Sequence, residues 1–114
     1  MVTADYVPER GDIVWIEFSP HAGHEQAGRR PALVLSPVRF NRRRGLALMC
    51  PITRSVSDFP LEVPVISDCG ISGVVMSDQV KSTDWRARYA KYAGKVDPIV
   101  VDQVVENINA LLGV

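Results

Sequence analysis

Two short segments of the chain hold polar side chains that suit proton transfer and the binding of phosphate. The first reads GHEQAGRRP and carries His24, Glu25, Arg29 and Arg30. It runs directly into the apolar sequence ALVL, so we expect these polar groups on a loop anchored by a buried strand, where binding and catalytic residues are often found. The second segment, PIT, closes another apolar run at Thr53. We predict that the two segments form the two walls of one site.

The charges of the chain are balanced in number but not in position. Lys plus Arg and Asp plus Glu each number 13, so the formal net charge is zero, which argues against a dedicated nucleic-acid binder. Between Gln26 and Ser57 there is no acidic residue. The arginines in that interval are Arg29, Arg30, Arg39, Arg42, Arg43, Arg44 and Arg54. They form either a solvated loop, the interpretation favoured for 42–44 alone, or an electropositive surface whose natural ligand is phosphate.

Length and composition indicate a single domain over residues 1–114. A hydrophobic fraction of 46% and a charged fraction of 23% are ordinary for a soluble globular protein. No apolar run reaches the roughly 18 residues that span a bilayer. The first residues lack the pattern of a secretory signal, so we expect a cytoplasmic protein.

Neither the cysteines nor the histidines form a pattern typical of a metal site. Cys50 and Cys69 lie in no CxxC spacing, and the apolar neighbours of Cys50 predict a buried free thiol. His21, His24 and Glu25 are close in sequence, but two histidines three residues apart without further ligands are weak grounds for a metal. We therefore expect neither a metal nor another cofactor.

The remaining pattern predicts a small α+β domain. Strands are expected at 10–18, 32–36, 46–53, 73–81 and 89–96, with an edge strand or two short pieces at 59–66. The run 32–36 does not alternate, so it should be buried on both faces. Residues 37–45 form a basic connector with room for a short helical turn.

A C-terminal helix is the clearest element that the sequence predicts. Asp97 suits the N-cap, Pro98 the first helical position and Gly113 the C-terminal stop. Its apolar face is expected to consist of Val101, Val104, Val105, Ile108, Leu111 and Leu112.

Five segments match one known family in order and spacing. They are RGDIVWIEFSP, GHEQAGRRPALVLSP, PIT, GVVMSDQVKSTDWRAR and the C-terminal helix. In these segments the chain resembles the MazF/PemK family of toxin endoribonucleases from type II toxin–antitoxin systems. The resemblance implies an SH3-like antiparallel sheet or barrel with a C-terminal helix and one or two short helices, and a homodimer. It also implies a cognate antitoxin whose acidic, disordered tail blocks the active site.

The resemblance further implies which residues act on RNA. The implied catalytic residues are Arg30, Thr53, Glu25 and His24. The implied RNA-binding residues are Gln26, Arg29, Arg54, Asp78, Gln79 and Lys81. The implied activity is metal-free cleavage of single-stranded RNA at a short sequence, by attack of the 2′-hydroxyl, giving a 2′,3′-cyclic phosphate and a 5′-hydroxyl.

The source of the general base stays open. Arg30 suits the charge that develops on the phosphate, and Thr53 can donate a hydrogen bond to it. Because arginine does not readily give up its proton, Glu25 or His24 is the better candidate for proton transfer. A subset of the family pairs a histidine like His24 with an aspartate like Asp78. That subset carries an arginine where this chain has Met76.

Two alternatives belong to other functional classes. Gyrase-poisoning toxins are similar in fold but act through a C-terminal helix that ends in an exposed aromatic residue, whereas this chain ends in ALLGV. A simple SH3-like nucleic-acid-binding module would not need Arg30 to be paired with Thr53. Trp15 and Trp85 lie among apolar or strand-like neighbours, and we predict that they pack in the core or in a dimer interface rather than stack on bases.

Overall fold

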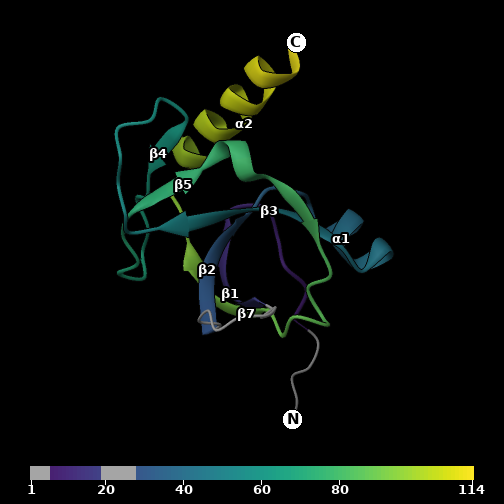
Figure 1. Ribbon diagram of the computed structural model, residues 1–114. Coiled ribbons are helices and arrows are strands. Elements are labelled where there is room, and N and C mark those ends of the chain that lie inside the picture. Colours follow the sequence, from purple (N-terminus) through teal and green to yellow (C-terminus); the bar gives the residue numbers. More distant parts are fainter. Residues whose placement is uncertain (1–5, 19–27) are drawn as a thin grey trace.

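The computed structural model describes residues 6–18 and 28–114, which form an antiparallel sheet with helices packed around it (Figure 1). The strands are β1 (Asp12–Phe18), β2 (Gly28–Val34), β3 (Ala47–Thr53), β4 (Glu62–Pro64), β5 (Val74–Met76), β6 (Lys81–Thr83) and β7 (Lys91–Lys95). The helices are α1 (Val38–Arg44), the 3-10 turn η1 (Ser77–Gln79) and α2 (Pro98–Leu112). The predicted α+β fold is confirmed. Among the described helices, none has the length and apolar character that a membrane crossing requires.

The order of the strands places β2 and β3 in the middle of the sheet. It runs β4-β5-β3-β2-β1-β7, and β6 pairs with the first half of β3. The segment 59–66 is reduced to β4 at one end of this order, as expected for an edge strand with two prolines. The basic connector contains α1, which ends at Gly45 with φ +70°.

The second half of strand β2, residues 32–34, is buried on both faces because an apolar cluster covers each side of the sheet there. Leu33 packs with the buried valines of α2. Ala32 and Val34 belong to a second cluster that includes Trp85. Since successive side chains of a strand point to opposite faces, the two clusters lie on opposite sides of β2. The predicted double burial of this run is confirmed, as is the core position of Trp85, which is 4% exposed and donates its indole N–H to Asn41 O at 3.1 Å.

Helix α2 begins and ends where the sequence predicts. The side chain of Asp97 accepts a hydrogen bond from Ile99 N at 3.0 Å, and Pro98 occupies the first turn. Gly113 ends the helix with φ +77°, a conformation that glycine adopts without strain. The caps therefore fix the two ends of the helix.

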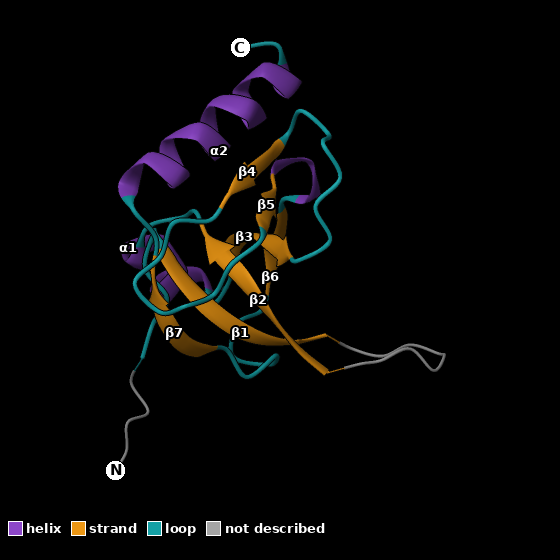
Figure 2. Ribbon diagram, turned by 90° about the vertical axis from the view of Figure 1, so that its left-hand side faces the viewer, coloured by secondary structure: helices purple, strands orange, loops and turns teal. Residues whose placement is uncertain are grey.

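The buried face of α2 is shorter than predicted. Val104 is fully buried, but Leu111 and Leu112 are 54% and 70% exposed. Figures 1 and 2 show the C-terminal turns of α2 extending beyond the sheet, which explains why these leucines are not covered. Val100, which the sequence pattern did not assign to this face, is buried instead.

The segment predicted as one strand at 73–81 consists of three elements. From Val75 to Thr83 the chain advances eight residues, while the paired residues of β3 advance five, from Ile52 to Ala47. The three extra residues are taken up by η1, which interrupts the ladder as a bulge does. The hydroxyl of Ser77 in η1 is buried and accepts a hydrogen bond from Asn107 Nδ2 of α2 at 3.1 Å. The prediction is wrong because this contact with α2 is not a local property of the segment.

Cys50 is a buried free thiol, as predicted. Its side chain is inaccessible to solvent and forms no disulfide. Burial in apolar surroundings raises the pKa of Cys50 to about 12, so the group is a neutral thiol near pH 7. Cys50 therefore belongs to the core and not to the chemistry of the protein.

Candidate active site

A cleft forms where β2 and β3 part. Their pairing stops at Ala32↔Pro51. Beyond that pair, β2 remains alongside β1 back to Gly28, whereas the last residues of β3 pair with β5. Pro31 and Pro51 stand at the parting, and neither has a backbone N–H that could extend the ladder. The sheet therefore opens between the start of β2 and the end of β3.

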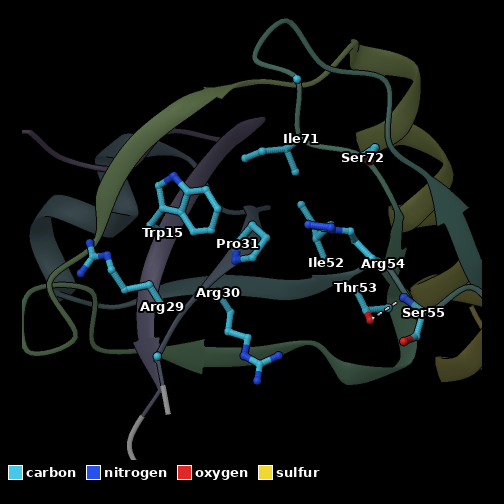
Figure 3. Close-up of a pocket in the computed structure, with 12 residues that line it drawn as sticks. Trp15, Arg29, Arg30, Pro31, Ile52, Thr53, Arg54, Ser55, Ile71 and Ser72 are labelled. Carbon is cyan, nitrogen blue, oxygen red and sulfur yellow. Dashed lines mark hydrogen bonds between the residues drawn. The ribbon is translucent and has the colours of Figure 1, made fainter. Parts of the chain in front are cut away.

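The opening is a cleft of about 780 Å³ (Figure 3). It is lined by Trp15, Gly28, Arg29, Arg30, Pro31, Ile52, Thr53, Arg54, Ser55, Gly70, Ile71 and Ser72. Both predicted walls contribute to it. The loop 70–72 adds a third wall that sequence reasoning missed, because its position depends on the pairing of β5 with β3.

Arg30 and Thr53 lie across the cleft from one another. Continued by two residues along each strand, the register Ala32↔Pro51 would set Arg30 opposite Thr53. Because side chains alternate between faces, both project from the same face of their strands. Figure 3 shows them on the two strands that border the opening. Because β2 and β3 no longer pair at this point, an open cleft lies between the guanidinium of Arg30 and the hydroxyl of Thr53.

Both side chains keep hydrogen-bond donors that no described residue uses. Arg30 is exposed and makes no hydrogen bond or ion pair with any described residue. The Oγ1 of Thr53 accepts a hydrogen bond from Ser55 N at 3.1 Å, so its hydroxyl hydrogen is available to donate. The planar, charged guanidinium of Arg30 and the hydroxyl of Thr53 can therefore both donate hydrogen bonds to the oxygens of a phosphate.

The cleft is electropositive. Arg29, Arg30 and Arg54 are exposed and line it, and none of the residues in its described lining is acidic. Arg29 Nη2 donates to Tyr89 O at 3.1 Å, which fixes this guanidinium on the side away from Arg30. Concave surfaces of one sign concentrate ligands of the opposite sign, so the cleft should attract a polyanion.

Close packing against Gly73 holds the end of β3 in place. A Cβ built at Gly73 would lie 2.2 Å from Thr53 O and 3.2 Å from Arg54 Cα. The φ of Gly73 is +123°, a conformation that is strained for any residue with a side chain. Only glycine therefore allows this backbone to approach Thr53.

The structure divides the predicted site residues into three groups. Those that line the cleft are Arg29, Arg30, Thr53 and Arg54. Those that are described but do not line it are Asp78, Gln79 and Lys81, of η1 and β6. Those that lie outside the described residues are His24, Glu25 and Gln26, whose roles stay predictions.

Two predictions about residues of the cleft are corrected. Arg29 and Arg30 belong to a strand and not to a loop, because β2 begins at Gly28 and pairs there with β1. Trp15 was expected in the core or in a dimer interface, but it is half-buried, belongs to neither buried cluster and lines the cleft. The prediction of a core position is wrong for Trp15, whereas a place in a dimer interface stays a prediction.

Comparison with known proteins places the chain in a family. The model for the PemK-like, MazF-like toxin of type II toxin-antitoxin systems matches residues 9–112. The chain belongs to this toxin family. The resemblance inferred from the sequence is thereby confirmed.

Individual members of the family are similar over nearly the whole chain. The endoribonuclease toxin MazF of Escherichia coli strain K12 is 45% identical over 108 residues, which cover 95% of this chain and 96% of the relative. A crystal structure of MazE-MazF from Deinococcus radiodurans matches with a TM-score of 0.90 and 46% identity, over 96% of this chain and 98% of that one. A structure of MazF from the same organism matches with a TM-score of 0.86 and 45% identity, over 96% of this chain and 100% of that one.

Proposed function

We propose that the cleft between β2 and β3 is where this chain cleaves single-stranded RNA at a short sequence. The chain is an endoribonuclease toxin, as are the family members MazF, ChpB and PemK to which it is similar. One observation carries the assignment of the site. Arg30 and Thr53 face one electropositive cleft from two strands, and both keep donors that no described residue uses.

The reaction that these groups suit is an internal transfer at phosphorus. The 2′-oxygen of the substrate attacks the adjacent phosphorus, and its proton passes to a base. The bond from phosphorus to the 5′-oxygen breaks, and that oxygen takes up a proton. The products are a 2′,3′-cyclic phosphate and a 5′-hydroxyl. Arg30 stabilises the charge on the phosphate oxygens, Arg54 adds positive charge to the same cleft, and Thr53 donates a hydrogen bond to those oxygens.

The protons are proposed to move through His24 or Glu25. The described lining of the cleft holds no His, Asp, Glu, Lys or Cys side chain that could titrate near neutral pH. A guanidinium and an aliphatic hydroxyl are poor general bases, because neither readily gives up a proton. His24 and Glu25 directly precede β2 in the sequence, which supports one of them as the general base.

Cleavage is proposed to need no metal. The described lining offers guanidinium groups, which bind oxyanions, and it has no carboxylate or imidazole of the kind that holds a catalytic divalent cation. Within residues 6–18 and 28–114 there is no cluster of three His, Cys, Asp or Glu side chains that could hold a metal. The nucleophile comes instead from the substrate, which is already tethered next to the phosphorus.

The test is to incubate the purified protein with a long RNA in EDTA and to map the ends of the fragments. We expect cutting at a recurrent short sequence, with 5′-hydroxyl and 2′,3′-cyclic phosphate ends. Activity that EDTA abolishes and magnesium restores, or fragments with 5′-phosphates, would instead indicate a hydrolytic nuclease. An intact RNA would point to a non-catalytic member of the fold.

We further propose that the chain acts in the cytoplasm as a homodimer and is neutralised by a cognate antitoxin with an acidic, disordered tail. Complexes of MazE with MazF from Deinococcus radiodurans support a protein partner, and the electropositive cleft supports an acidic one.

For a homodimer, light scattering should give twice the mass of the chain at micromolar concentration. Inhibition by an acidic peptide should weaken as salt rises, because exposed charges are screened within about 10 Å at 0.1 M. A monomer would refute the first proposal, and inhibition insensitive to salt would refute the second.

A further inference from the structure

A second hollow adjoins the cleft on the side of β7. Its volume is about 560 Å³, and it shares Trp15, Arg29 and Ile71 with the cleft. Lys91 and Ala93 of β7 line its far side. The two hollows therefore adjoin, and Trp15 borders both of them. Figure 3 shows the ring of Trp15 between Arg29 and Pro31, below Ile71.

Trp15 occupies the centre of a row of side chains that crosses the sheet. In the strand registers it is the direct partner of Lys91 on one side and of Pro31 on the other. Cross-strand partners lie on the same face, about 4.5–5.5 Å apart at Cβ. An indole is thus flanked by a cation and by an apolar ring, next to the cleft.

The ring of Trp15 is not held by the core as that of Trp85 is. Trp85 is 4% exposed and uses its indole N–H in a hydrogen bond. Trp15 is half-buried, and its indole N–H donates to no described residue. A large aromatic side chain that is partly exposed beside a charged cleft is typical of a surface that binds another molecule.

The charges around Trp15 favour an anionic ligand. Arg29 is held by Tyr89 O, and Lys91 is exposed without a described partner. Glu17 is opposite Arg29 in the register and is the acid on this part of β1, but it forms no ion pair with a described residue. Two cations against one carboxylate leave the surface positive.

We propose that the second hollow binds a nucleotide of the RNA that flanks the cleaved bond. A base stacks on Trp15, and Lys91 and Arg29 bind the phosphates on either side of it. Stacking on an aromatic side chain within a positive groove is how proteins hold single strands without pairing their bases. The proposal rests on the proposed function, because it extends the path of the same strand away from Arg30 and Thr53.

The test uses an oligonucleotide that contains the cleavage sequence but carries 2′-deoxyribose at the cleaved position, so that binding is measured without cleavage. The chain has two tryptophans, and Trp15→Phe leaves only the buried Trp85. Saturating oligonucleotide should quench the tryptophan emission of the unmodified protein and leave that of Trp15→Phe unchanged. Trp15→Ala should bind the oligonucleotide about 5- to 150-fold more weakly, since stacking contributes about 1–3 kcal/mol per base.

The contribution of Lys91 is tested by a separate substitution. Lys91→Gln should lower the slope of log affinity against log salt by about one, as expected for one lost phosphate contact. The control is Arg44→Gln, which removes an exposed cation of α1 outside both hollows and should leave the slope unchanged. Circular dichroism should show that each variant is folded.

The outcomes separate the subsite from the function. If the fluorescence emission of Trp15 does not change when the oligonucleotide is added and the protein still cuts RNA, the proposed subsite is refuted and the proposed function stands. If Trp15 emission responds to protein concentration and not to the oligonucleotide, a second copy of the chain covers this face and the subsite is refuted. If the unmodified protein neither binds nor cuts RNA, the proposed function itself fails.

Discussion

Replacing Arg30 by alanine is expected to lower the single-turnover rate of RNA cleavage by about 10²–10³, the usual effect of removing one fixed donor to a developing oxyanion. The loss should fall on the chemical step, because the guanidinium stabilises charge that the phosphate gains only in the transition state. Thr53→Val, which keeps the shape of the side chain but lacks the hydroxyl, should act in the same direction.

Neither change should unfold the protein. Arg30 is exposed and makes no contact with a described polar group, so thermal unfolding of Arg30→Ala should be as cooperative as that of the unmodified chain. Arg44→Ala, which removes an exposed cation of α1 that does not line the cleft, is the control and should retain the rate. An Arg30→Ala protein that cuts the same positions at nearly the original rate would show that the catalytic site lies elsewhere.

Gly73→Ala is expected to cost both stability and activity. The new methyl would lie 2.2 Å from the carbonyl oxygen of Thr53, so β5 or the end of β3 must move. A displacement of about 1 Å at a catalytic group can lower a rate by about 10². Chemical denaturation and single-turnover cleavage measure the two effects in the same preparation.

Gly28→Ala is the matched control for stability. Gly28 has almost the same φ, +124° against +123° for Gly73, but a Cβ there meets nothing within 4 Å. It therefore carries only the cost of the strained backbone, about 1–3 kcal/mol. Equal losses of stability in the two variants would show that the contact between Gly73 and Thr53 does not hold the end of β3.

The parts of the fold that follow from local chemistry were predictable. Asp97, Pro98 and Gly113 define α2 because caps depend on neighbouring residues alone. The burial of residues 32–36 on both faces follows from the unbroken apolar run that begins at Ala32. Pro31 and the end of β3 at Thr53 were sufficient to indicate that the two polar segments approach one another.

The parts that depend on distant contacts were not predictable. The 3-10 turn η1, which interrupts 73–81, packs on α2 and accepts a hydrogen bond from Asn107, 30 residues further along the chain. The exposure of Trp15 to the cleft depends on where the loop 70–72 packs, which no periodicity of β1 reveals. Leu111 and Leu112 continue the apolar pattern of α2, but the pattern does not show where the sheet beneath them ends. The roles of His24 and Glu25 stay predictions that mutation and a pH–rate profile can separate.

Whether the RNA supplies its own nucleophile is tested most directly with one change in the substrate. Two oligonucleotides with the cleavage sequence are compared, one all-ribose and one with a single 2′-deoxyribose immediately 5′ of the cleaved phosphate. We expect the first to be cut in EDTA and the second to be bound with similar affinity but left intact, because phosphate and base contacts remain while the attacking hydroxyl is missing. Cleavage of the deoxy oligonucleotide at the same bond would contradict the mechanism, since the nucleophile would then have to be water or a side chain of the protein.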